Sequence, residues 1–249
     1  MQIADGMDLA LDIGNTHIKY GIFRGDHLFA SGIFSSVSHQ RLLAFAAFHR
    51  VKNLIISSVR QENPVNLLRA RKYFHTVMEL SASTPLPINI TYQSKETLGK
   101  DRIAAAVGAS CLFPDREKLV IDAGSAITID FVSHQNEFLG GNISPGLHMR
   151  FRALHHYTNK LPLVTKQNQV PLLGTHTQEA IASGVQNGIV FELNHYIEKF
   201  KARHPKIAII ITGGDMKFFD NKLKYPIFAE SNLVLIGLSK ILKFNLYAH

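Results

Sequence analysis

Two segments with the residue types needed for phosphate chemistry occur 110 positions apart in this chain. Residues 9–32 read LALDIGNTHIKYGIFRGDHLFASG, and residues 119–142 read LVIDAGSAITIDFVSHQNEFLGGN. Each contains an Asp-x-Gly turn after an apolar strand, with Asp12 in the first and Asp122 in the second. A turn glycine lets the backbone approach a ligand, so that its N–H groups can bind phosphate oxygens. A carboxylate at the strand end can meet a hydrated cation, so the pair of turns predicts phosphoryl transfer.

Two further clusters could complete a reaction site. The run Gly99-Lys100-Asp101-Arg102 opens a helix rich in small residues. Its aspartate could act as a base beside an anion-binding guanidinium, although aspartate at a helix start is also a common cap. The run Gly213-Gly214-Asp215 follows an apolar strand and suits an adenine or ribose packed against bare backbone. The competing interpretation of this second run is an ordinary helix N-terminus.

The elements that must position these residues predict a duplicated α/β fold. Each repeated segment reads as a strand, a turn and two more strands divided by polar turns. Helices are expected at His39–Arg50, Asn63–Tyr73, Asp101–Leu112, Thr177–Arg203 and Leu233–Phe244, and further strands at Lys52–Ser57, Ile88–Tyr92 and Lys206–Thr212. We expect two lobes, residues 1–116 and 117–249, with a nucleotide cleft between them.

Composition excludes several other classes of protein. Lys+Arg 27 against Asp+Glu 19 gives a formal net charge of +8, but the bases are scattered, which favours a solvated surface over nucleic-acid binding. The single cysteine, Cys111, excludes a disulfide framework and a zinc site built on paired cysteines. No apolar run approaches the ~18–20 residues that span a bilayer, and the first fifteen residues carry three acids and no base. We therefore expect a cytoplasmic protein.

The motifs together resemble a known family. DIGNT, GKDR, DAGSAITID, GGNISPG, TNKLP and ITGGD, in this order, resemble the type III pantothenate kinases of the acetate and sugar kinase/Hsp70/actin superfamily. The resemblance runs from Asp12 to about Gly237. It implies two actin-like ATPase (ribonuclease H-like) lobes and a homodimer. It also implies transfer of the γ-phosphoryl group of ATP to the primary hydroxyl of pantothenate, the first step of coenzyme A synthesis.

The resemblance also implies roles for individual residues. Asp101 would be the base that accepts the hydroxyl proton of pantothenate. The ATP site would comprise Asp12, Ile13, Gly14, Asn15, Thr16, His17, Ile18, Lys19, Ser125, Gly213 and Gly214. The pantothenate site would comprise Tyr92, Gly99, Lys100, Asp101, Arg102 and Thr177, the last reaching across the dimer interface. Asp12 would hold Mg²⁺ directly or through water, and Asp122 would bind K⁺ or NH₄⁺.

Three positions depart from the family pattern. Ser125 replaces a threonine but keeps the hydroxyl group. Lys100 stands where the family often has a small or apolar residue, and Asn159 replaces a common alanine before the Leu-Pro pair. None of these changes removes a proposed catalytic group, so we expect an active enzyme.

Two alternatives share the same fold. One is a regulatory relative like the Bvg accessory factors, which would bind ATP without phosphorylating pantothenate. The other is a kinase of the same superfamily that acts on a sugar or a carboxylic acid. The retained Asp12, Asp101 and Asp122 count against the first alternative, and the GKDR and GGNISPG/TNKLP segments discriminate against the second by resemblance.

Overall fold

The computed structural model describes residues 6–36, 38–60 and 65–247, and it divides the chain into two compact units. The first unit comprises Met1–Pro114, Asn136–Phe138 and Asn232–His249. The second comprises Asp115–Gln135 and Leu139–Ser231. Within the described residues, no helix is both long enough and apolar enough to cross a membrane.

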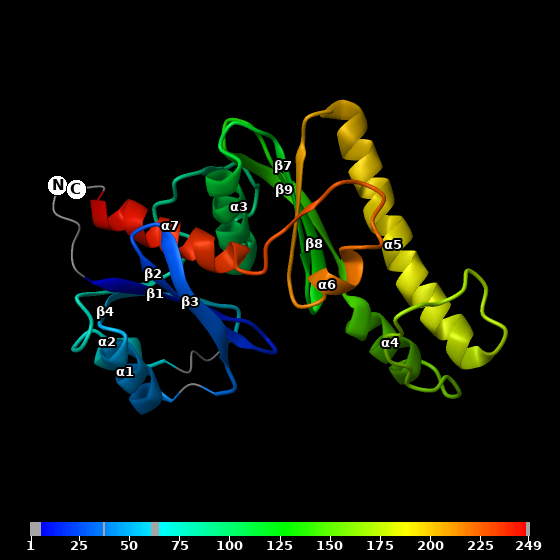
Figure 1. Cartoon of the computed structure of the whole chain (residues 1–249), viewed down its shortest axis with the longest axis horizontal. Coiled ribbons are helices and arrows are strands. Elements are labelled where there is room, and N and C mark those ends of the chain that lie inside the picture. Colours follow the sequence, from blue (N-terminus) through cyan, green and yellow to red (C-terminus); the bar gives the residue numbers. More distant parts are fainter. Residues whose placement is uncertain (1–5, 37, 61–64, 248–249) are drawn as a thin grey trace. The chain divides into compact units, whose positions relative to one another are not determined.

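The first unit is built on a five-stranded sheet with the order β3-β2-β1-β4-β5. Its elements in chain order are β1 (Met7–Ile13), β2 (Ile18–Arg24), β3 (His27–Phe34), α1 (His39–Phe48), β4 (Val51–Ser58), α2 (Leu67–Ala70), β5 (Thr76–Glu79), β6 (Asn89–Ile90), η1 (Lys95–Thr97), α3 (Lys100–Leu112) and α7 (Leu233–Tyr247). Strands β1 to β3 form an antiparallel meander, whereas β4 and β5 run parallel to β1. Helices α1 and α2 cover one face of this sheet, and α7 covers the other (Figure 1).

The second unit repeats this sheet with the order β9-β8-β7-β10-β11. Its elements are β7 (Lys118–Ala123), β8 (Ala126–Val132), β9 (Glu137–Pro145), α4 (Leu147–His156), α5 (Thr177–Arg203), β10 (Ala208–Thr212), α6 (Met216–Phe219) and β11 (Phe228–Ala229). Strand β8 pairs antiparallel with β7, and β10 pairs parallel with it. Glu137 and Phe138, at the start of β9, belong to the first unit, where they pair in parallel with β6. The same strand order in both sheets, with one antiparallel and two parallel pairs in matching positions, confirms the predicted duplication.

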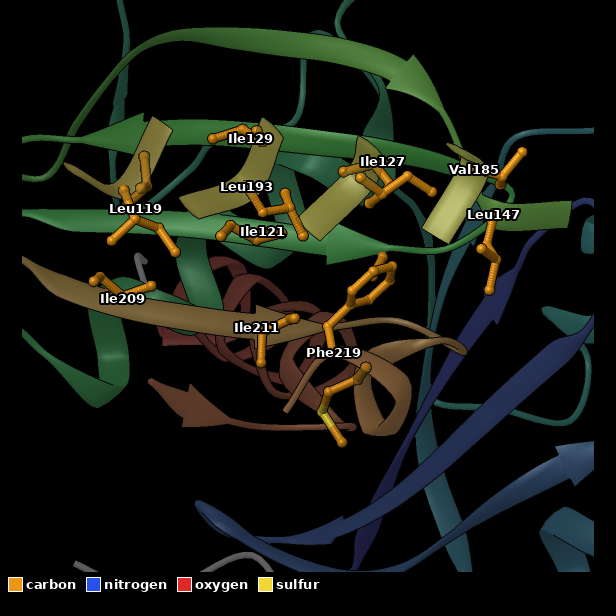
Figure 2. Close-up of a cluster of buried hydrophobic side chains, with 14 of the residues drawn as sticks. Leu119, Ile121, Ile127, Ile129, Leu147, Val185, Leu193, Ile209, Ile211 and Phe219 are labelled. Atoms are coloured by element: carbon orange, nitrogen blue, oxygen red, sulfur yellow. The ribbon is translucent and has the colours of Figure 1, made fainter. Parts of the chain in front are cut away.

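The core of the second unit explains its apolar strand sequences. Alternate residues of β7, β8 and β10 point to one face, where they meet side chains from α4, α5 and α6 (Figure 2). The labelled members are Leu119, Ile121, Ile127, Ile129, Leu147, Val185, Leu193, Ile209, Ile211 and Phe219. Burial of each such side chain contributes about 1.5–3 kcal/mol to the stability of the unit. This packing fixes the ends of β7 and β8, between which the second Asp-x-Gly turn lies.

The C-terminal helix belongs to the first unit, which differs from the predicted 117–249 lobe. Helix α7 packs against α3 at small residues: a Cβ on Gly237 would collide with the carbonyl oxygen of Ala104, and one on Gly108 with that of Leu233. The bare backbone of these glycines lets the two helices approach closely. Apart from Asn136–Phe138, the chain leaves the first unit after Pro114 and returns to it at Asn232.

Most predicted elements appear at or near their expected bounds. The helix Thr177–Arg203 is confirmed as α5, and the closing helix extends to Tyr247. The helix predicted at Asn63–Tyr73 is wrong in length, because its described part is the single turn of α2, which the side chain of Asn66 caps. Asn63 itself lies outside the described residues. The strand predicted at Ile88–Tyr92 shrinks to β6, which is too short for periodicity to delimit.

Candidate functional site

The first candidate loop is the turn that joins β1 to β2. Gly14 donates its N–H to the carbonyl oxygen of His17 at 3.0 Å, which closes the turn. Asp12 lies near the end of β1, half-buried, opposite Lys19 of β2. The turn therefore brings a carboxylate, a bare glycine backbone and a lysine together at one end of the sheet.

The side chains within this predicted segment divide into two groups. Asn15, Thr16 and His17 are exposed on the turn. Ile13 and Ile18 are 0% and 4% exposed, and their side chains belong to the hydrophobic core. These two isoleucines thus anchor the turn, and a ligand could reach them through their backbone alone.

A residue that sequence reasoning missed holds the same turn. Arg60 donates from Nε to the carbonyl oxygen of Gly14 at 2.8 Å and from Nη2 to that of Asn15 at 3.5 Å. No local pattern marks this arginine, because its partners lie in a distant segment of the sequence.

The second candidate group begins α3. Gly99 is the N-cap residue without a side-chain cap, and Asp101 lies in the first turn, half-buried. Its Oδ1 accepts a hydrogen bond from the backbone N–H of Arg102 at 2.9 Å. The carboxylate thus lies at the positive end of the helix dipole.

An ion pair locates the start of α3 relative to the first sheet. Lys100 Nζ lies 3.7 Å from Glu79 Oε1, and Glu79 is the last residue of β5. Strands β1, β4 and β5 are parallel, so Glu79 and Asp12 lie at the same carboxyl edge of the sheet, about 10 Å apart at ~4.8 Å per strand. Asp101 is therefore on the edge that carries Asp12. The lysine that departs from the family pattern is accommodated by this ion pair.

The predicted substrate residues Tyr92 and Arg102 are in contact. The Arg102 guanidinium lies 5.7 Å from the ring centre of Tyr92 and 5.6 Å from that of Phe138. The two rings are 6.0 Å apart in an edge-to-face arrangement. Arg102 is only 5% exposed, so cation–π contact fixes a charged group beside Asp101.

The second candidate turn lies between β7 and β8. Gly124 donates its N–H to the carbonyl oxygen of Ala126 at 3.1 Å. Gly146, which ends the glycine-rich segment noted in the sequence, donates its N–H to the carbonyl oxygen of Ser125 at 3.1 Å. A Cβ on Gly146 would collide with the carbonyl oxygens of Gly124 and Ser125, so only glycine allows this approach.

The third glycine site, Gly213-Gly214, packs against the turn between β7 and β8. Gly213 has φ +97°, a conformation that side chains other than glycine rarely adopt. A Cβ there would collide with Asp122 Oδ1 and the carbonyl oxygen of Ala123. Asp215 donates its N–H to that same carbonyl at 2.9 Å. The structure thus brings Asp122 and Gly213 together beside the β7–β8 turn. The Asp122 carboxylate and the Ala123 carbonyl are hard oxygen donors, which suit a cation.

Asp215 itself supplies an ion pair that the sequence did not suggest. It is the N-cap residue of α6, but its side chain makes no cap hydrogen bond. Instead, Asp215 Oδ1 lies 3.2 Å from Lys166 Nζ and 3.9 Å from His148 Nε2. The glycine pair therefore has fixed charged neighbours.

Thr177 is the first residue of α5 and is exposed. The loop before it is held by Glu179, whose Oε2 accepts from the Thr175 N–H at 2.7 Å and from the Thr175 hydroxyl at 2.9 Å. These two hydrogen bonds hold the pKa of Glu179 below its ordinary 4.5. The role of Thr177 across a dimer interface stays a prediction. Asn159 is exposed after α4.

Comparison with known proteins agrees with this arrangement. The family model described as type III pantothenate kinase matches residues 8–199. A type III pantothenate kinase from Cytophaga hutchinsonii is 43% identical over 239 residues, covering 96% of this chain and 100% of the relative.

Solved structures with similar folds belong to two functional classes. A structure described as a Baf family transcriptional activator from Campylobacter jejuni has a TM-score of 0.64 at 26% identity, over 96% of this chain and 98% of its own. One described as an N-acetylmannosamine kinase from Listeria monocytogenes has a TM-score of 0.52 at 14% identity, over 96% of this chain and 99% of its own. The second likeness concerns the fold alone.

Proposed function

Because this chain belongs to the type III pantothenate kinase family, we propose that it transfers the γ-phosphoryl group of ATP to the primary hydroxyl of pantothenate. The product would be 4′-phosphopantothenate, in the first step of coenzyme A synthesis. The observation that carries this proposal is the pair of equivalent turns, each with its aspartate, together with Asp101 in the first turn of α3. Such an ATP-dependent step suits a cytoplasmic protein.

The turn residues would bind the triphosphate. Backbone N–H groups of Asp12–Lys19 would bind phosphate oxygens, with the Ser125 hydroxyl as a second donor. Gly214 would lie against the adenosine, because a Cβ there would meet nothing within 4 Å, which leaves room for a flat group. Gly213 would contribute through its backbone alone, because Asp122 and Ala123 fill the space that a Cβ would take.

The carboxylates fit the cations expected for this chemistry. No group of three or more metal-binding side chains occurs among the described residues, but Mg²⁺ commonly binds through one or two carboxylates plus substrate phosphates. Asp12 would hold Mg²⁺, which neutralises charge on the β- and γ-phosphate oxygens. Asp122, with the nearby carbonyl of Ala123, would hold K⁺ or NH₄⁺.

Asp101 would act as the base. An alcohol becomes a competent nucleophile when its proton is drawn away during attack, and Asp101 would receive that proton on its carboxylate. Tyr92, Gly99, Lys100 and Arg102 would line the pantothenate pocket. The buried Arg102 guanidinium is suited to an anionic group such as the pantothenate carboxylate.

A homodimer would complete the site with Thr177. Support comes from exposed apolar side chains in the second unit, where Ile143 is 65% and Phe191 57% exposed. These two residues lie on β9 and α5 respectively. Large apolar side chains left exposed on a folded unit are candidates for a subunit interface.

The test is an assay with purified protein, ATP, Mg²⁺ and pantothenate, with and without K⁺. We expect phosphopantothenate and ADP in equal amounts, and a higher rate with K⁺. Binding of ATP with no phosphorylation of pantothenate would instead favour a regulatory protein, the role named for the Campylobacter relative. Parallel assays with sugars and small carboxylic acids would detect a different acceptor.

A further inference from the structure

Arg60, two residues after β4, binds the turn that joins β1 to β2. Its guanidinium donates to the carbonyl oxygens of Gly14 at 2.8 Å and of Asn15 at 3.5 Å. One side chain therefore holds two consecutive peptide groups of the predicted phosphate loop.

The sheet itself sets the position of Arg60. Val59 donates its N–H to the carbonyl oxygen of Ile13 at 3.2 Å, which continues the pairing of β4 with β1 past the strand ends. The backbone N–H of Arg60 then donates to the Ser58 hydroxyl at 3.2 Å. Two hydrogen bonds, at Val59 and at Arg60, therefore fix the backbone that carries the arginine side chain.

Peptide geometry converts this contact into an orientation of the loop. In a planar trans peptide the carbonyl and the following N–H point in opposite directions. Because the carbonyls of Gly14 and Asn15 point toward Arg60, the N–H groups of Asn15 and Thr16 point away from it. Successive N–H groups that share a direction form a concavity that binds anions.

The second unit holds its equivalent turn in a similar way without an arginine. The carbonyl oxygen of Ser125 accepts from the backbone N–H of Gly146 at 3.1 Å. In both units a later segment of the chain therefore binds a carbonyl of the Asp-x-Gly turn. The two turns therefore share a bound carbonyl group at the same position, although the residue that binds it differs.

We propose that Arg60 is a positioning residue for ATP: it holds the Gly14–Thr16 backbone in the orientation that binds the phosphates, without touching the reacting atoms. This role rests on the proposed function of the turn as a phosphate loop. Lysine could keep the charge but donates from a single nitrogen, whereas the planar guanidinium donates from two.

The experiment compares Arg60→Gln and Arg60→Lys with the control Arg71→Gln, which removes one positive charge from an exposed arginine of the same unit. Binding of MgATP without pantothenate is measured by calorimetry, and KM and kcat are measured for both substrates. We expect Arg60→Gln to raise the Kd and KM for ATP about 10- to 100-fold, with the KM for pantothenate within twofold of wild type. Arg60→Lys should recover part of this loss, and Arg71→Gln should match wild type.

Several results would overturn the role of Arg60. Equal ATP binding by Arg60→Gln and Arg71→Gln would do so, as would full recovery by Arg60→Lys, since charge alone would then suffice. A parallel loss of ATP affinity, pantothenate affinity and melting temperature would indicate a merely structural role. Wild-type protein that binds ATP but phosphorylates nothing would refute the proposed function alone, whereas wild type without ATP binding would refute both.

Discussion

Replacing Asp101 with Asn separates the proposed base from the fold around it. Asp101 Oδ1 accepts the Arg102 N–H at 2.9 Å, and an amide oxygen can accept the same hydrogen bond. What the fold loses is the interaction of a negative charge with the N-terminus of α3, worth about 0.3–1 kcal/mol. For a protein of this size, such a loss lowers the melting temperature by roughly 1–4 °C.

The expected effect on catalysis is far larger. Loss of a positioned base lowers kcat by about 10²–10⁴-fold, which corresponds to roughly 2.7–5.4 kcal/mol of transition-state stabilisation. The assay follows ADP release with both substrates saturating, and the KM for ATP should change little. The matched control is Asp115→Asn, an exposed aspartate of the second unit, whose kcat should remain within twofold of wild type.

Two results would refute the reasoning about Asp101. A kcat within threefold of wild type would show that the carboxylate is not the base. A melting temperature lowered by more than about 8 °C would show that the substitution damages the fold, beyond what the helix dipole accounts for.

Three other changes test the packing, the electrostatics and the assembly. Gly237→Ala should lower the free energy of unfolding by about 1–3 kcal/mol, because its Cβ would collide with the backbone of α3. In the control Gly188→Ala the new Cβ meets nothing within 4 Å, so this variant should be as stable as wild type or more stable. Denaturant titration measures both. Lys243 holds the pKa of Asp26 below its ordinary 3.8, so this stabilisation is present above pH 3.8 and is lost as the pH falls through the lowered pKa. Asp26→Asn should therefore be less stable than wild type at pH 6, with the difference shrinking below pH 3.8; a difference independent of pH would contradict the ion pair. Phe191→Glu should shift the sedimentation of the protein from dimer to monomer, and an unchanged dimer would exclude this surface as the interface.

Local sequence patterns were sufficient for most secondary structure. Strand periodicity and turn glycines located β1, β2, β7 and β8, and a long helical period located α5 at its observed bounds. The family resemblance, rather than any local pattern, predicted Tyr92 and Arg102 as residues of the pantothenate site, and the structure places the two side chains in contact. Short elements such as α2 and β6 were misjudged, because a few residues carry too little periodicity.

Packing decided how the chain divides. The helix α7 is apolar and helical in any context, but nothing in its own sequence says which sheet it covers. Its place on the first unit follows from the close approach at Gly237 and Gly108, a contact between segments far apart in the chain. The predicted boundary at 116/117 was placed at the start of the second repeat, and the repeat pattern contains no sign that Asn232–His249 packs with the first unit.

The sequence by itself determined the two Asp-x-Gly turns and the carboxylates they carry, because a strand, a glycine and an aspartate within a few residues are a local pattern. Tertiary structure alone decided what holds those turns: Arg60 on the carbonyls of Gly14 and Asn15, Gly146 on Ser125, and Glu79 beside Lys100. Each of these partners comes from a separate segment of the chain. Their contacts exist because parallel strands bring their carboxyl ends to one edge, a consequence of sheet pairing that no short stretch of sequence contains.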